Sequence, residues 1–185
     1  TATNVDFTGD FKAKEGSKII LKGGSVTASD YYENGKKDGY TEFGAIGANS
    51  SIEADGVDIK SATLATDGAK VTIKNSNINT VEGIWAARKG TINLDGKATY
   101  TASGEGVEAV DGGVINISGG GTLHTTNISV EGNGSKFITD GSVEAQKIVA
   151  GSNASVILNG GGKITGYKYD DGNTLAASVT GNSTL

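Results

Sequence analysis

The 185-residue chain contains no cysteine, no proline and no methionine, and it has one histidine and one tryptophan. Without cysteine, disulfide bonds and thiolate metal sites are excluded. One histidine is too little for a histidine-based metal centre or a Ser–His–Asp triad. Proline removes a backbone donor, so its absence is typical of strands that lie inside a sheet.

Charge and hydropathy argue against two further classes of protein, those that bind nucleic acids and those that span a membrane. The formal net charge is −5, with lysines scattered among the acids, so the basic stripe of a nucleic-acid-binding protein is missing. No apolar run approaches the roughly 20 residues that cross a bilayer, and no signal peptide is visible. Because the chain opens on Thr1 without a methionine, we expect it to be an excerpt of a longer precursor.

The chain does contain a repeat of apolar pairs, each spaced by two residues, among 30 glycines. The first pair of each repeat reads Ile19/Leu21, Ile52/Ala54, Val71/Ile73, Ile92/Leu94, Ile115/Ile117, Phe137/Thr139 and Val156/Leu158. Successive pairs begin 19 to 23 residues apart, except that 33 residues separate Ile19 from Ile52. A regular coil with one insertion explains this spacing.

Two further pairs follow in each repeat. The second reads Val26/Ala28, Val57/Ile59, Ile78/Thr80, Leu123/Thr125 and Val143/Ala145, with Ala98/Tyr100 and Ile164/Gly166 as weaker members. The third reads Ala45/Gly47, Ala62/Leu64, Ile84/Ala86, Val107/Ala109, Ile128/Val130 and Ile148/Ala150. A spacing of two is the strand period, so both members face one side. Three strands in each coil of about 19–23 residues predict an all-β, right-handed parallel β-helix, with glycine and asparagine at its corners.

We interpret residues 1–185 as one β-helix segment with a loop insertion at 29–44. The insertion gathers the aromatic residues Tyr31, Tyr32, Tyr40 and Phe43, which suit recognition of a sugar or a protein. Solenoid insertions emerge as loops on one face, often the binding face. Trp85 stands between two inward residues and is expected to project outward as a second ligand-binding candidate. The alternatives are that the loop aromatics fold onto the rod and that a loop covers Trp85.

The coil motif resembles a known family. Gly-Ile-Trp-Ala at 83–86 leads to Thr-Ile-Asn-Leu at 91–94, and Gly-Val-Glu-Ala at 106–109 leads to Val-Ile-Asn-Ile at 114–117. This is similar to the pertactin-like passenger domain of bacterial autotransporters, proteins of type V secretion with a pectin-lyase-like β-helix. The resemblance implies a bacterial surface or secreted protein, anchored only through a barrel absent from this chain. Its implied partner is a host surface protein or glycan, or another copy of itself, with no nucleic acid and no cofactor.

An enzyme is the main alternative, because β-helices also house polysaccharide lyases and hydrolases. Glycoside hydrolysis needs two carboxylates at a set separation. Asp170 and Asp171 are the nearest candidates, but neighbouring acids in Tyr-Asp-Asp-Gly are typical of a solvated turn. His124, between Leu123 and Thr125, is expected on the outside of a strand. We therefore predict no catalytic residue and no metal ligand, and we keep a purely structural stalk as a third possibility.

Overall fold

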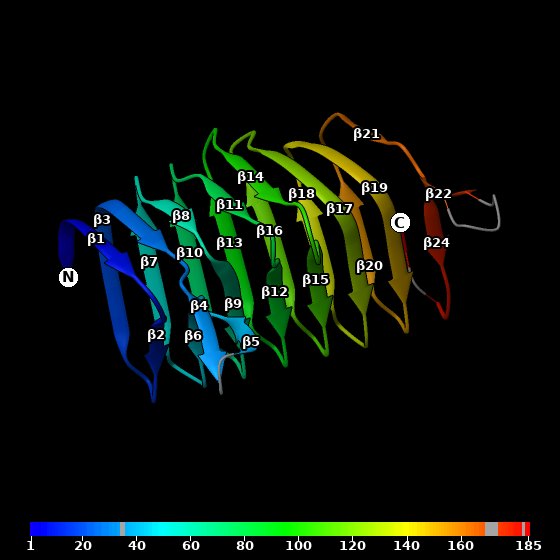
Figure 1. The fold of residues 1–185 in the computed structure, drawn as a ribbon. Coiled ribbons are helices and arrows are strands. Elements are labelled where there is room, and N and C mark those ends of the chain that lie inside the picture. The colour runs from blue at the N-terminus through cyan, green and yellow to red at the C-terminus, as the bar shows by residue number, and fades with distance from the viewer. Residues whose placement is uncertain (34–35, 169–173, 183) are drawn as a thin grey trace.

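The computed structural model describes residues 1–33, 36–168, 174–182 and 184–185, with the backbone alone described for the strand residues of 30–40 and 167–175. These residues form an all-β solenoid of about seven turns (Figure 1). Nearly all strands pair in parallel with the equivalent strand of the next coil. No helix that would cross a membrane occurs in the described ranges.

Each coil has three strand segments, which stack into three faces of the rod. The first face consists of the beginning of β3 (Lys18–Thr27), β7 (Ser51–Asp55), β10 (Lys70–Lys74), β13 (Thr91–Asp95), β16 (Val114–Ser118), β18 (Lys136–Thr139) and β20 (Ser155–Leu158). The pairing register along this face joins Ile19 to Ile52, Ile52 to Val71, and so on to Val156. The first predicted pair is therefore confirmed in every coil.

The second and third faces complete the coil. The second contains the ends of β1 (Ala2–Thr8) and β3, β8 (Asp58–Lys60), β11 (Ile78–Thr80), β14 (Thr99–Ala102), the beginnings of β17 (Thr122–Glu131) and β19 (Ser142–Gly151), and β21 (Gly162–Ile164). The third contains β2 (Phe11–Lys14), β6 (Glu42–Ile46), β9 (Ala62–Thr66), β12 (Ile84–Ala87), β15 (Val107–Val110), the ends of β17 and β19, and β24 (Ala177–Val179).

The interior is a continuous column of apolar side chains. Ile84, Val107, Ile128 and Ile148 stack in register on the third face and are at most 1% exposed. Parallel stacking buries the inner side of every strand while the residues between the pairs face solvent. The rod is therefore held by one core that runs its whole length, as predicted.

Five predicted pairs are wrong in register. Ile59, and not Val57, aligns with Val26 and with Ile78 on the second face. The structure aligns Phe43/Ala45 and Thr63/Ala65 with Ile84/Ala86, in place of Ala45/Gly47 and Ala62/Leu64. Likewise Tyr100/Ala102 faces inward in place of Ala98/Tyr100, and Gly162/Ile164 in place of Ile164/Gly166. Thr63 is fully buried although it carries a hydroxyl, so the apolar pattern pointed to its neighbours instead.

Glycine is required at one corner because backbones of adjacent coils approach closely there. A Cβ at Gly90 would lie 2.0 Å from the Ala65 carbonyl oxygen, and a Cβ at Gly113 would lie 1.9 Å from the Ala86 carbonyl oxygen. No side chain fits at either distance. These two glycines therefore fix how tightly the chain turns from the third face to the first.

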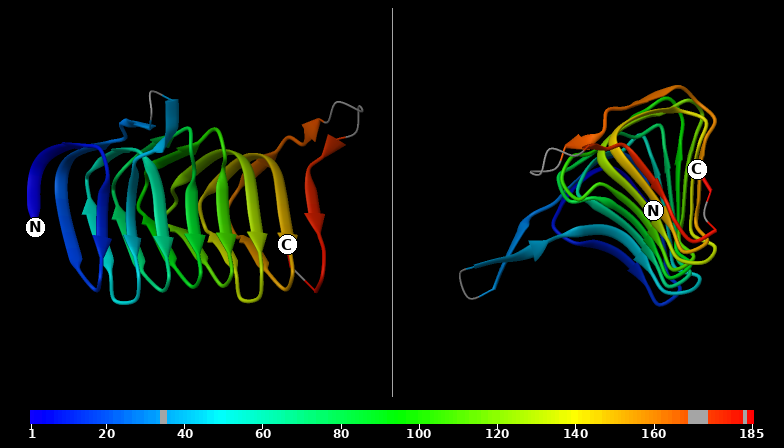
Figure 2. Two further views of the ribbon diagram at one scale, coloured as in Figure 1. Left: turned by 60° about the horizontal axis from the view of Figure 1, so that its bottom comes forward. Right: turned by 90° about the vertical axis from the view of Figure 1, so that its right-hand side faces the viewer.

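The insertion forms an antiparallel hairpin of β4 (Asp30–Glu33) and β5 (Lys36–Tyr40) that projects from the rod (Figure 2). It is shorter than predicted. Residues 42–44 belong to β6, which pairs with β2 and β9, so the chain outside the coil covers 29–41 instead of 29–44. The sequence pattern did not predict this strand, because Glu42 is charged and Gly44 has no side chain.

A second hairpin, absent from the sequence prediction, interrupts the last coil. It consists of β22 (Tyr167–Lys168) and β23 (Thr174–Leu175), which pair in antiparallel fashion between β21 and β24. Both hairpins leave the coil at the corner between the second and third faces. Figure 2 accordingly shows them on the same side of the rod, at its two ends.

Candidate functional site

The base of the first hairpin is tied firmly to the rod. The Ser29 backbone N–H donates to the Thr41 hydroxyl at 2.7 Å, and the Ser61 hydroxyl of the next coil donates to the Thr41 carbonyl at 2.8 Å. Thr41 itself is buried. Tyr31, Tyr32 and Tyr40 lie on the hairpin strands, and their side chains are outside the described part of the structure. Their role in recognition stays a prediction.

Phe43 is a correction to the predicted site. Its side chain is 0% exposed and belongs to the hydrophobic core. Because β6 continues the third face, position 43 points inward in register with Thr63 and Phe11. A ligand at the surface therefore has no access to this ring, and its role is structural.

Trp85 faces outward from β12, as predicted, and is partly buried. Its register neighbours are Leu64 and Glu108, whereas the predicted pair Ala62/Leu64 would have placed Thr63 beside it. The indole lies against its own strand, because a Cβ on Gly83 would come within 2.8 Å of Trp85 Cε2 and Nε1. No described residue accepts a hydrogen bond from the indole Nε1, so both a ring and a donor are available to a ligand.

Glu108, the neighbour of Trp85, lies in an unfavourable electrostatic environment. Burial raises the pKa of its carboxyl, and the nearby charges of Glu105 and Glu131 raise that pKa further. A desolvated carboxylate beside like charges favours the protonated form. The outer side of the third face therefore combines an aromatic ring with a group of acids, an arrangement that the sequence pattern did not reveal.

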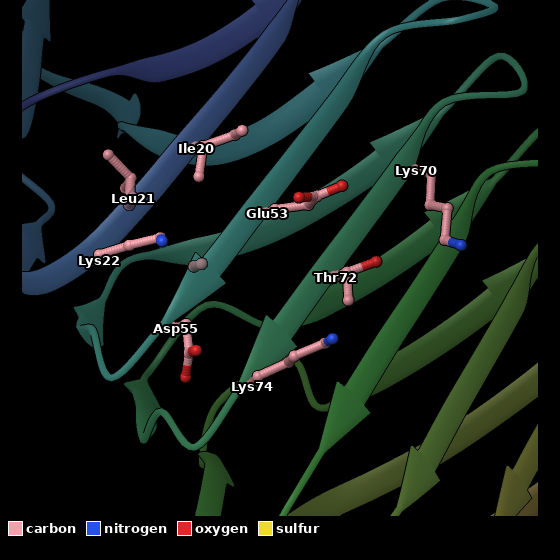
Figure 3. Close-up of a pocket in the computed structure, with 9 residues that line it drawn as sticks. Ile20, Leu21, Lys22, Glu53, Asp55, Lys70, Thr72 and Lys74 are labelled. Atoms are coloured by element: carbon pink, nitrogen blue, oxygen red, sulfur yellow. The ribbon is translucent and has the colours of Figure 1, made fainter. Parts of the chain in front are cut away.

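The first face carries a second candidate site, a hollow of about 320 Å³ over β3, β7 and β10 (Figure 3). Its charged lining consists of Lys22, Glu53, Asp55, Lys70 and Lys74. The side chains come from three adjacent strands and are carried on outward positions, as Figure 3 shows. The sequence holds a signal for this site, since these residues are the outward neighbours of the first apolar pairs.

Ion pairs in this region are few. The Lys18 ammonium lies 2.7 Å from the Glu53 carboxylate. Asp55 accepts a hydrogen bond from the Asn75 side chain at 3.0 Å. Neither Lys22 nor Lys74 has an acidic partner within 4.0 Å in the described ranges, and both are exposed. Their charges are therefore available to another molecule.

The remaining polar candidates are isolated. His124 Nδ1 lies 3.0 Å from Glu144 on the outside of the second face, as expected for an exposed histidine. Asp170 and Asp171 lie outside the described residues. Within the described ranges, no three histidine, cysteine or acidic side chains are placed to hold a metal ion.

Comparisons with known proteins identified no match among family models, curated proteins or solved structures.

Proposed function

We propose that the chain is a non-catalytic, autotransporter-type passenger segment, displayed on or released from a bacterial cell, that acts in adhesion to a host or in cell–cell self-association. The observation that carries this proposal is the hairpin β4–β5, which projects from an otherwise regular rod on a fixed base. A solenoid coil contacts only its neighbours, so chain outside the coil is not needed for folding and is free for recognition. The coil motif at 83–94 and 106–117, which resembles pertactin-like passengers, supports the bacterial surface location.

The experiment is an adhesion assay with the chain displayed on beads. Wild-type beads are expected to bind epithelial cells or to bind one another. Replacing residues 31–39 with a short Gly-Ser link is expected to abolish the binding to epithelial cells, and Trp85→Ala tests the second candidate separately. The matched control is Thr101→Ala, a partly buried outward position on the second face. Wild-type beads that bind neither epithelial cells nor one another would show that the proposed function is wrong.

A second candidate function, a carbohydrate-active enzyme, is favoured by Glu108 alone. A carboxyl whose pKa is raised is suited to donate a proton as general acid. Trp85 in the preceding coil offers a surface on which a sugar ring can stack. Release of reducing ends from a polysaccharide by the purified chain, abolished in Glu108→Gln, would establish this function in place of adhesion.

A further inference from the structure

The outward charges on the first face alternate in sign along the rod. One column, which we call the charged column, reads Lys22, Asp55, Lys74 and Asp95 in four successive coils. Adjacent members are joined by strand pairing and so lie about 4.8 Å apart. The hollow spans this column and the columns beside it, and Lys22, Asp55 and Lys74 are among its lining residues (Figure 3).

This order is complementary to itself when reversed. If a second rod faces the first with its axis antiparallel, about a two-fold axis between β7 and β10, then Lys22 lies opposite Asp95 and Asp55 lies opposite Lys74. The symmetry repeats both pairs, so the column makes four contacts between opposite charges. Any other centre on the column makes fewer such contacts or places like charges together. The charge sequence therefore selects one register.

The two neighbouring columns of outward residues are compatible with the same antiparallel pair of rods. The middle column reads Ile20, Glu53, Thr72 and Asn93, and the outer column reads Lys18, Ser51, Lys70 and Thr91. In the antiparallel pair, Lys70 faces Ser51 of the second copy and lies one column from its Glu53. Lys18 faces Thr91 of the second copy. In none of the three columns do two like charges lie directly opposite each other.

A parallel pair of rods is disfavoured by the same residues. A two-fold axis along the rod places the outer column opposite the charged column of the second copy. Lys18 then faces Lys22, and Lys70 faces Lys74. Like-charge contacts oppose association and suppress the wrong arrangement. The face thus discriminates between two orientations of the same partner.

We propose that the first face is a self-association surface, on which two copies of this chain pair antiparallel through Lys22, Asp55, Lys74 and Asp95. In this pair the Lys74 side chain of the second copy enters the hollow between Lys22 and Lys74 and reaches Asp55. Exposed ion pairs each contribute little, so one pair of rods associates weakly. Many rods at a surface bind strongly through the sum of such contacts. The inference rests on the proposed function, because it names the partner in the self-association arm of that proposal.

The test uses beads coated densely with the full chain in two colours. Wild-type beads are expected to cluster at 50 mM salt and to disperse at 500 mM salt, since exposed charge pairs are screened. Asp55→Lys beads and Lys74→Asp beads, each alone, are expected to cluster at least tenfold less. Mixing the two variants restores clustering, because each reversed charge then meets an opposite one. The double variant Asp55→Lys/Lys74→Asp is expected to cluster alone for the same reason.

Matched controls change the same charges elsewhere. Lys136→Asp lies on the first face outside the four coils, and Asp58→Lys lies on the second face, so both are expected to cluster like wild type. Restoration on mixing also shows that the single variants are folded. Single variants that cluster like wild type, or a mixture that fails to cluster, overturn the proposal. So does Lys74-dependent binding of polygalacturonate by rods that do not cluster, which makes the hollow a polyanion site. Wild-type beads that cluster but do not bind epithelial cells support this pairing and contradict only adhesion to a host.

Discussion

The ring of Phe43 stacks on the ring of Phe11 from the preceding coil, with centroids 5.8 Å apart and planes 10° from parallel. Phe7 contacts the same ring of Phe11 at a centroid distance of 4.7 Å. These aromatic residues lie in the N-terminal coils of the solenoid, and Phe43 belongs to β6, the strand that follows the first hairpin. The chain therefore returns from the hairpin directly into an apolar aromatic cluster.

Phe43→Ala is expected to lower the free energy of unfolding by about 3–5 kcal/mol, because it removes a fully buried ring and leaves a cavity. Urea denaturation followed by circular dichroism measures the change. Phe43→Leu keeps most of the volume and is expected to cost about 1.5 kcal/mol or less. Equal stability of wild type and Phe43→Ala would show that position 43 faces solvent.

Deleting the hairpin tests where the coil resumes. Replacing residues 31–39 with a Gly-Ser link is expected to leave the free energy of unfolding within about 1 kcal/mol, since loop-length changes are inexpensive. Extending the deletion to residue 43 removes the start of β6 and the Phe43 stack, and is expected to cause a large loss of stability. Thermal unfolding of both variants decides the boundary. Similar stability of the two deletions would refute the assignment of 42–44 to the coil.

Two neighbouring residues of β19 test the register of the third face. Ile148 is 1% exposed, whereas Val149 points outward and is partly buried. Ile148→Asp places an unpaired charge in the core and is expected to cost more than about 4 kcal/mol. Val149→Asp is expected to cost less than about 1 kcal/mol. The reverse order in denaturant titrations would require a shift of the strand by one residue.

The glycine corner provides a matched pair of substitutions. Gly113→Ala would bring a Cβ within 1.9 Å of the Ala86 carbonyl, so adjacent coils must separate there. We expect a loss of about 1–3 kcal/mol or more. Gly161→Ala meets nothing within 4 Å and is expected to change stability by less than about 0.5 kcal/mol. Differential scanning calorimetry of the two variants tests the close approach of the coils directly.

Glu108 makes stability depend on pH in the acid range. Because burial and the charges of Glu105 and Glu131 raise its pKa in the folded state, the folded chain binds this proton more tightly than the unfolded chain. Stability from this group is therefore largest below the unfolded pKa of about 4.3, and it falls as pH rises through the folded pKa. Glu108→Gln is expected to be more stable than wild type at pH 7, with the difference vanishing near pH 4. Urea titrations over this pH range provide the measurement, and a constant difference would contradict the raised pKa.

The sequence was sufficient to predict the coil wherever the inward residues are apolar. Ile92, Ile115 and Phe137 fall into register as expected because the strand period and the apolar pattern coincide. Prediction failed at Thr63, where a hydroxyl occupies an inward position, and at Gly44, where the outward position has no side chain. In both cases the backbone pairing of neighbouring coils decides the register, and a single-coil pattern does not contain that information.

For the candidate sites too, features of a single coil could be predicted, and features that join neighbouring coils could not. The outward direction of Trp85 could be predicted from its inward neighbours Ile84 and Ala86. The charged column could not be recognised from one coil, because its order appears only when residues 19 to 33 positions apart are stacked. The raised pKa of Glu108 depends in the same way on Glu131 from the following coil.

The corner between the second and third faces accepts additional chain without disturbing the strands on either side. One hairpin interrupts the coil that contains β3 and the other interrupts the coil that contains β20, the first and seventh strands of the first face. Six coil steps of about 4.8 Å place them roughly 29 Å apart along the rod. Some intervening coils turn at this corner with short loops, such as the exposed residues 103–105, whereas β17 and β19 run through it without a break. The number of coils sets the distance between such a loop and each hairpin. Peptide epitopes inserted at these positions would therefore be held at defined spacings along the rod.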